Sequence, residues 1–394
     1  MDGRKEVIQA TRLIAFAAAS AGLLLSGAAV SIAQEAKLPS TLTFTAYDTG
    51  SSGFNIAVAV GKMLKDKHGT DVRVLPAGND VARLAPVRSG RAQASAMGIG
   101  VYFAQEGVFE FGVKEWGPQP LRLILSSTDC NGMSLGVTKD VGVKEIKDLK
   151  GKRVGMVVGS PALNQNALSV LAFGGLTGKD VKLVEFSSYG AMWKGLLNNE
   201  ADAAFASSIS GQAKEVETSP RGLFYPSAPA ADKAGWERVR KVGPYFVPHK
   251  ATCGVGLSPQ HSAELPSYAY PIFMAYAKQP ADVVYGLSKA MIVNYNDYKD
   301  NAPGAAGLEA KRQNLAWVLP YHEGAVRALK EAGLWKAEHD AHNQALVKRQ
   351  DTLAVAWTAF LKTNPPEDKA AFGKAWMAAR KAALAAAGMD AIFE

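Results

Sequence analysis

Two loops rich in glycine and serine stand where a predicted strand ends and a predicted helix begins. The first is Thr49–Gly50–Ser51–Ser52–Gly53, and the second lies in the segment GSPALNQN at residues 159–166. A helix N-terminus carries unpaired N–H donors and a partial positive charge, and glycine lets a ligand approach the backbone closely. Each loop alone is equally consistent with an ordinary serine-capped turn. Because the loops fall at facing positions of two predicted domains, together they favour capture of a small anion.

Neither loop is typical of phosphate binding, because no lysine follows the glycines at the GxxxxGK[ST] spacing. A G-x-S-x-G match at residues 132–136 would make Ser134 the nucleophile of a secreted serine hydrolase. A nucleophile elbow requires a strand-to-helix turn, whereas the residues after Ser134 predict a strand followed by a turn. We therefore expect no catalytic residue and no cofactor, and keep the hydrolase as the alternative from another class of function.

His339 and His342 lie one helical turn apart in the sequence EHDAH, a spacing that could bind a metal ion. Their neighbours are polar, so a solvated helix face is the better interpretation. No other cluster has the spacing of metal ligands, and no metal is expected.

Strand-like and helix-like segments alternate from residue 41 onward, which predicts an α/β fold with a largely parallel sheet. Asn79 or Asp80 can cap the helix that follows the segment VRVLPAG. Two extended segments, near residues 130 and 250, interrupt the alternation and predict two domains joined by two crossover strands, with a cleft between them. The expected parts are domain 1 at residues 34–130 and 249–335, domain 2 at residues 131–248, and a C-terminal helical extension at residues 336–394.

The predicted extension carries apolar side chains at helical spacing on both sides of the sequence NPP. They are Leu346, Leu353, Trp357 and Phe360 in the first stretch and Phe372, Trp376, Ala379 and Ala383 in the second. We expect two amphipathic helices that pack on the first domain, with a dimer or permease contact as the alternative.

The N-terminus has the features of a cleavable signal peptide. Three basic residues precede an apolar run at residues 13–30, and small residues follow at Ser31 and Ala33. We predict that residues 1–33 are removed by cleavage after Ala33; a membrane anchor is the alternative, although the run is short for a span.

The charge and the cysteines narrow the function further. A net charge of +8 over 394 residues is not concentrated in Lys/Arg runs, which disfavours nucleic-acid binding. Cys130 and Cys253 can form one disulfide in an oxidising compartment, and two separate buried thiols fit the sequence about equally well.

The order of the segments resembles the TAXI-type solute-binding proteins of TRAP transporters over about residues 41–335. The likeness rests on YDTGSSGFNIAVAVGKML, VLPAGNDVARLAPVRSGRAQASAMG, IKDLKGKRVGMVVGSPALNQNALSVL, LLNNEADAAFASSIS, ADVVYGLSKAM and LPYHEGAVRALKEAGLW. It implies a type II two-domain periplasmic binding protein, expected to be a monomer. Such a receptor binds a small carboxylate (a dicarboxylate, a 2-oxo acid or an acidic amino acid such as glutamate) and delivers it to a TRAP membrane permease driven by an ion gradient.

The resemblance also implies which residues contact the ligand. They are Thr49, Ser51, Ser52 and Phe54 in the first loop, Met97 and Tyr102 after the third strand, Ser160, Pro161 and Asn164 in the second loop, and Ser207 and Ser208 at a later strand end. The family's first loop usually has more glycine, close to TGGTGG, so Phe54 departs from the pattern and could stack on the ligand or restrict it. A receptor for an ABC importer or for a sensor system is the nearest alternative.

Overall fold

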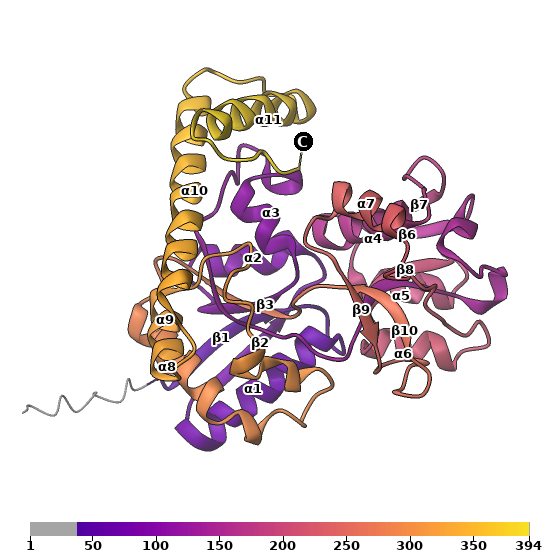
Figure 1. Ribbon diagram of the computed structural model, residues 1–394, viewed down its shortest axis with the longest axis horizontal. Helices are drawn as coiled ribbons and strands as arrows, with labels where there is room; N and C mark the ends of the chain where they lie inside the picture. The colour runs from indigo at the N-terminus through magenta and orange to yellow at the C-terminus, as the bar shows by residue number, and fades with distance from the viewer. Residues whose placement is uncertain (1–37, 394) are drawn as a thin grey trace, which may run out of the picture. The chain divides into compact units, whose positions relative to one another are not determined.

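The computed structural model describes residues 38–393 (Figure 1). The predicted signal peptide lies outside these residues. The described chain forms two lobes, each a sheet flanked by helices. The predicted fold class, a two-domain α/β periplasmic binding protein with crossovers and a C-terminal helical extension, is confirmed.

The first lobe is built on a five-stranded sheet in the order β2-β1-β3-β11-β4. Its strands are β1 (Thr41–Ala46), β2 (Asp71–Pro76), β3 (Ala94–Met97), β4 (Leu121–Ser126) and β11 (Ile272–Tyr276). Strand β1 pairs in parallel with β2 and β3, whereas β11 runs antiparallel to β3 and β4. The helices of this lobe are α1 (Ser52–His68), α2 (Asp80–Arg88), α3 (Gly100–Glu106), α8 (Ala281–Val293) and α9 (Glu323–Glu331). Helices follow the parallel strands, so the loops at the carboxyl ends of those strands gather at one edge of the sheet.

The second lobe has a four-stranded sheet in the order β5-β8-β6-β7 (Figure 1). Its strands are β5 (Met133–Val137), β6 (Arg153–Val157), β7 (Lys182–Phe186) and β8 (Ala203–Ser207). Its helices are α4 (Pro161–Phe173), α5 (Tyr189–Leu197), α6 (Gly211–Thr218) and α7 (Lys233–Val242). Strand β5, the first strand after the chain crosses into this lobe, runs antiparallel to β8.

Two crossovers join the lobes. A disulfide between Cys130 and Cys253 links the two crossovers to each other, and the Cα atoms of these cysteines are 5.4 Å apart. The first crossover runs from β4 to β5. The second leads from a two-stranded antiparallel hairpin, β9 (Val247–Ala251) and β10 (Ala263–Ser267), into β11. The boundary predicted at residue 248 falls within β9, whereas the chain re-enters the first sheet only at β11. The domain boundaries themselves stay predictions.

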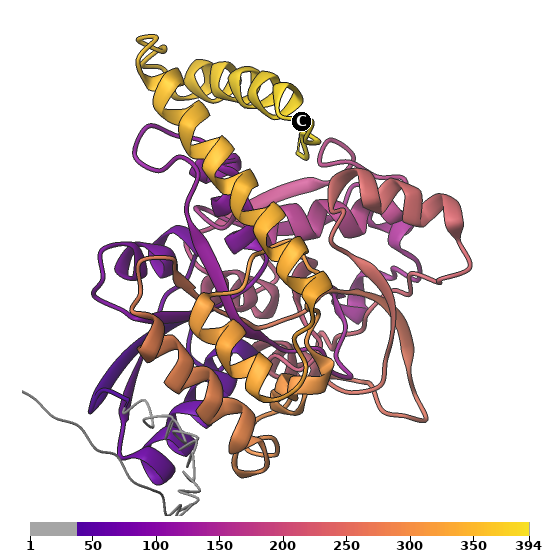
Figure 2. The same cartoon turned by 60° about the vertical axis from the view of Figure 1, so that its left-hand side comes forward.

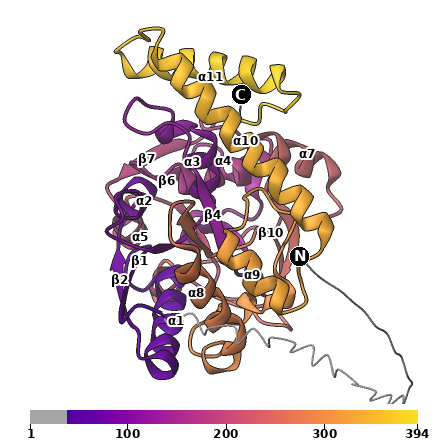
Figure 3. The same ribbon diagram turned by 90° about the vertical axis from the view of Figure 1, so that its left-hand side faces the viewer.

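The C-terminal extension consists of α10 (Ala337–Leu361) and α11 (Lys369–Ala386), which lies across the far end of α10 (Figures 2 and 3). Phe360, Phe372 and Trp376 form a small core between the two helices. Six short 3-10 helices complete the described elements, at Phe109–Phe111, Lys139–Val141, Ile146–Leu149, Tyr295–Asp297, Ala305–Leu308 and Ala310–Arg312.

A buried ion cluster fastens the extension to the first lobe. Glu106, at the end of α3, is fully buried and accepts two 2.7 Å hydrogen bonds from Arg349 of α10. Arg380 of α11 donates to the same carboxylate. Burial alone would raise the pKa of Glu106, but the hydrogen bonds and charges of the two arginines outweigh it, so the pKa lies below its ordinary value. Both helices therefore pack on the first lobe, as the spacing of their apolar residues predicts.

Candidate functional site

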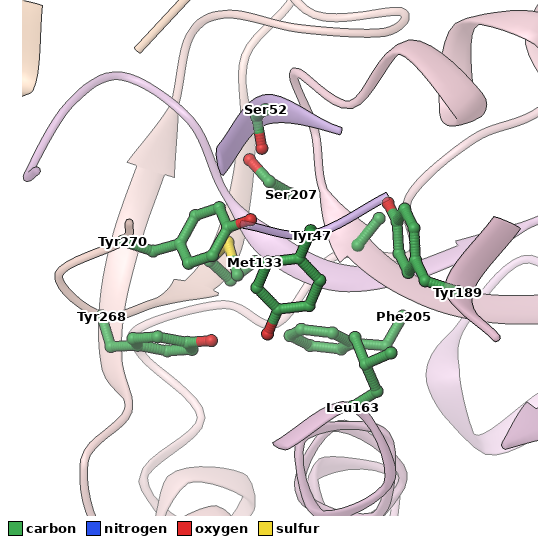
Figure 4. A pocket seen from close by; sticks show the side chains of 10 residues that line it. Tyr47, Ser52, Met133, Leu163, Tyr189, Phe205, Ser207, Tyr268 and Tyr270 are labelled. Atoms are coloured by element: carbon green, nitrogen blue, oxygen red, sulfur yellow. The ribbon is translucent and has the colours of Figure 1, made fainter. Parts of the chain in front are cut away.

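A small cavity lies between the lobes, at the carboxyl ends of β1 and β8 (Figure 4). Its volume is about 10 Å³, on a scale where one water molecule requires roughly 10–15 Å³. The first lobe and the second crossover supply Tyr47, Ser52, Tyr268 and Tyr270; the second lobe supplies Met133, Leu163, Tyr189, Phe205, Ala206 and Ser207. This is the edge of the sheet where open α/β folds bind ligands.

Four of the ten lining residues are tyrosines, and several of their rings contact one another edge to face. The ring centroids of Tyr47 and Tyr189, which come from different lobes, are 6.0 Å apart, and those of Tyr47 and Tyr270 are 5.9 Å apart. The Tyr189 hydroxyl shares a 2.7 Å hydrogen bond with Ser210, and the Tyr268 hydroxyl accepts a 3.1 Å hydrogen bond from the Asn166 side chain. Burial raises the pKa of Tyr47, Tyr189 and Tyr270, so these hydroxyls stay neutral at physiological pH.

Two serine hydroxyls mark one end of the cavity and Leu163 marks the other (Figure 4). Ser52 lies in the first turn of α1, and Ser207 ends β8, so the two hydroxyls come from opposite lobes. The Ser207 oxygen accepts a 2.9 Å hydrogen bond from the Asn131 side chain. Both serines are buried. This polar end can receive a small polar group of a ligand, while the rest of the wall combines apolar side chains with the rings and hydroxyls of tyrosines (Figure 4).

The N-terminus of α4 holds a carboxylate that belongs to the protein itself. The Asp80 carboxylate accepts a 2.7 Å hydrogen bond from the backbone N–H of Ala162 and a 3.2 Å hydrogen bond from the Ser160 hydroxyl. Asn79 caps α2, which leaves the Asp80 side chain free to reach across to the other lobe. Asp80 also forms an ion pair with Arg83, and both side chains are fully buried. The second loop thus binds a carboxylate, but one that comes from the first lobe of the same chain.

The first loop makes similar contacts with the second lobe. The Asp48 carboxylate accepts a 2.8 Å hydrogen bond from the Gly190 N–H at the start of α5. The carbonyl oxygen of Thr49 accepts a 2.8 Å hydrogen bond from the Gln212 side chain, close to the start of α6. Gly78 also lies against the second lobe, where an added Cβ would come within 2.4 Å of the Ser188 Cβ. The lobes are therefore held together by groups of the protein at three helix N-termini.

A match to the NMT1-like family covers residues 44–333. The chain belongs to the NMT1-like family. Solved structures similar to this NMT1-like protein include an ancestral arginine-binding protein bound to arginine (17% identity, 67% of this chain and 97% of that chain, TM-score 0.40). Another is the alkanesulfonate-binding protein SsuA from Xanthomonas axonopodis pv. citri bound to MOPS (14% identity, 79% of this chain and 84% of that chain, TM-score 0.42). Neither likeness is close enough to indicate a ligand for this chain.

Two of the residues predicted to bind ligand in this NMT1-like protein, Ser52 and Ser207, line the cavity. Others are bonded inside their own lobe. The Ser51 hydroxyl caps α1 by accepting from the Phe54 N–H, and the Asn164 amide makes two hydrogen bonds to the backbone of Val157.

The remaining predicted residues also lie away from the cavity wall. Ser208 donates a 2.8 Å hydrogen bond to the carbonyl oxygen of Cys253 and so supports the second crossover. Met97 is buried at the end of β3, and Tyr102 packs against Phe393 with ring centroids 5.2 Å apart. Thr49 is exposed, Phe54 is half-buried against the core, and Ser160 and Pro161 begin α4 beside Asp80.

The sequence reasoning missed the four tyrosines of the cavity. Tyr47 lies between the end of β1 and the first loop, so its place just after a strand was the available signal. Tyr268 and Tyr270 lie just before β11. Tyr189 begins α5 after a capping serine.

The residues considered above for catalysis or metal binding make structural contacts instead. Ser134 lies inside β5, paired with Ala206 of β8, and is fully buried, so it does not occupy a strand-to-helix turn. The His342 ring bonds to the carbonyl oxygen of Trp317, and His339 accepts from the Lys336 N–H. Across residues 38–393, no group of three or more His, Cys, Asp and Glu side chains is arranged to hold a metal ion. No helix in the same part of the chain is long and apolar enough to span a bilayer.

Proposed function

We propose that this protein is a periplasmic solute receptor that binds a small organic acid between its lobes and delivers it to an ion-gradient-driven TRAP permease. The observation that carries the proposal is the cavity between the lobes, with Ser52 from one lobe and Ser207 from the other at its polar end. The TAXI-like order of sequence segments supports a TRAP permease as the transport partner. We expect no catalysis, because Ser134 lies within a strand.

Binding would require the lobes to separate, admit the ligand and close on it. The hydroxyls of Ser52 and Ser207 would donate to the ligand's carboxylate, while the apolar wall would cover the rest of the molecule. Micromolar affinity requires a net free energy of about 8 kcal/mol. Hydrogen bonds to a charged group contribute roughly 1.5–3 kcal/mol each, so two hydroxyls and the covered apolar surface can supply it after the cost of association.

The test is a thermal-shift screen of the purified protein with amino acids, 2-oxo acids, aromatic acids and dicarboxylates, followed by calorimetry on each compound that stabilises it. We expect Ser52→Ala and Ser207→Ala each to weaken binding of the compound found by about tenfold, the loss of one hydrogen bond to a charge. Ser89→Ala, at an exposed position beyond α2, is the matched control and should bind as the parent protein does. Unchanged affinity in both cavity variants would place the site elsewhere.

Reconstituted uptake separates the two transport partners. A TRAP permease requires an ion gradient, whereas an ABC importer requires ATP. Uptake of the bound compound that depends on a sodium gradient and persists without ATP supports the proposal. Uptake that requires ATP would make the protein a receptor for an ABC importer.

A further inference from the structure

The wall of the interlobe cavity is aromatic and carries no charge. Five of the ten lining residues, Tyr47, Tyr189, Phe205, Tyr268 and Tyr270, are aromatic, and Met133, Leu163 and Ala206 add apolar surface. Within residues 38–393, the side chains that line this cavity include no Lys, Arg, Asp, Glu or His. The polar side chains that lack a ring are Ser52 and Ser207, which gather at one end (Figure 4).

One contact between the lobes at this cavity is itself a pair of rings. Tyr47 of the first lobe meets Tyr189 of the second with an interplanar angle of 68°. A flat aromatic ring can enter between two such rings with a small separation of the lobes, because its edge and faces replace the contacts that it interrupts. An extended aliphatic chain would interrupt the same contacts and replace them less well.

The charged groups nearest the cavity already have partners within the protein. Asp80 is paired with Arg83 and fills the N-terminus of α4, and Asp48 fills that of α5. A single carboxylate can be received by the two serine hydroxyls at the polar end. A second carboxylate would be buried among the tyrosines with no cation among the lining side chains to pair with, which is strongly unfavourable.

We infer that the ligand is an aromatic monocarboxylate, with its carboxylate at Ser52 and Ser207 and its ring between Tyr47 and Tyr189. This inference rests on the proposed function and narrows its ligand to one class of organic acid. It excludes succinate-like dicarboxylates and glutamate, whose second charge the cavity does not accommodate.

Calorimetry on the purified protein tests the inference with benzoate and phenylacetate as probes, against succinate, L-glutamate and the uncharged benzamide. We expect at least one of the two aromatic acids to bind more tightly than each of the three comparison compounds by about tenfold or more. Tighter binding of succinate or glutamate, or equal binding of benzamide, would overturn the inference. If neither aromatic acid binds, the inference is wrong; binding of another acid in the wider screen would then leave the proposed function standing, and no binding at all would overturn both.

Variants at Tyr189 separate the ring from the hydroxyl. Tyr189→Phe keeps the ring and should bind the tighter probe within about threefold of the parent, whereas Tyr189→Leu should lose about tenfold or more. Each variant is first checked for an unchanged circular dichroism spectrum. If Tyr189→Leu does not fold, Phe205→Leu removes a ring from the same wall and carries the same expectation. Parent-like affinity in the folded leucine variant would contradict a ring-binding site.

Discussion

Asp80 connects the lobes through a charge that the fold has buried completely. Its carboxylate is shared between Arg83 in the first lobe and the N-terminus of α4 in the second, where Ala162 and Ser160 donate to it. The substitution Asp80→Asn keeps the shape of the side chain and removes the charge. Arg83 then remains buried without its anion, stacked on the Tyr47 ring with Cζ 3.3 Å from the ring centroid.

The expected cost follows from the loss of one partner of a buried ion pair, which destabilises a protein by about 3–5 kcal/mol. The asparagine oxygen can still accept from the Ala162 N–H, so we expect the lower end, about 3 kcal/mol in the free energy of unfolding. Asp48→Asn is the matched control. Asp48 is half-exposed and receives one backbone hydrogen bond across the lobes, so its substitution should cost about 1 kcal/mol.

Urea unfolding followed by circular dichroism measures both variants under one set of conditions. The double variant Asp80→Asn/Arg83→Met removes both charges and should recover about 1 kcal/mol or more relative to Asp80→Asn, because no unpaired cation is left inside. An Asp80→Asn protein that is as stable as Asp48→Asn, or a double variant less stable than Asp80→Asn, would refute the assignment of a buried interlobe ion pair.

Three further predictions concern other parts of the chain. The pKa of Glu106 is lower in the folded protein than in the unfolded chain, where it is about 4.3. The stabilising effect of its carboxylate is therefore present above that unfolded pKa and is lost as the pH falls through the folded pKa. In urea titrations, Glu106→Gln should lower the free energy of unfolding by about 3 kcal/mol near pH 7 and by clearly less near pH 3. Replacing Cys130 and Cys253 by serine should lower the free energy of unfolding by about 2–5 kcal/mol, since their disulfide spans 123 residues, and an unchanged thermal midpoint would contradict this. A fluorophosphonate probe should not label the protein, and Ser134→Ala should change stability by less than about 1 kcal/mol, because the Ser134 hydroxyl is buried and, among the described residues, has no hydrogen-bond partner.

The fold was predictable because most elements are encoded locally. Apolar runs such as residues 121–126 and 272–276 are strands in the structure, and capping residues such as Asn79 mark where helices begin. The hairpin of β9 and β10 was not predicted. Strand β9 is largely exposed and contains Pro248, so its sequence lacks the alternation that signals a buried strand.

The site was predictable only in part, because its decisive contacts join distant residues. The serine-rich loops are local patterns, and one serine from the first loop, Ser52, does line the cavity. The pairing of Asp80 with the N-terminus of α4 spans 82 residues and depends on how the lobes meet. At the level of sequence, Asp80 is indistinguishable from a helix cap, and it becomes an interlobe contact because Asn79 takes the capping position instead.

The carboxylates of Asp80 and Asp48 also bear on the timing of binding. A cleft that the protein closes with its own groups must open before a solute can enter, so the observed rate of association should level off at high solute concentration. If the closed form occupied about 99% of the empty receptors, the apparent affinity would be about a hundredfold weaker than that of the open form. A permease that senses closure alone would then receive empty receptors as readily as loaded ones. Discrimination between them would depend on how far the inserted solute holds the lobes apart.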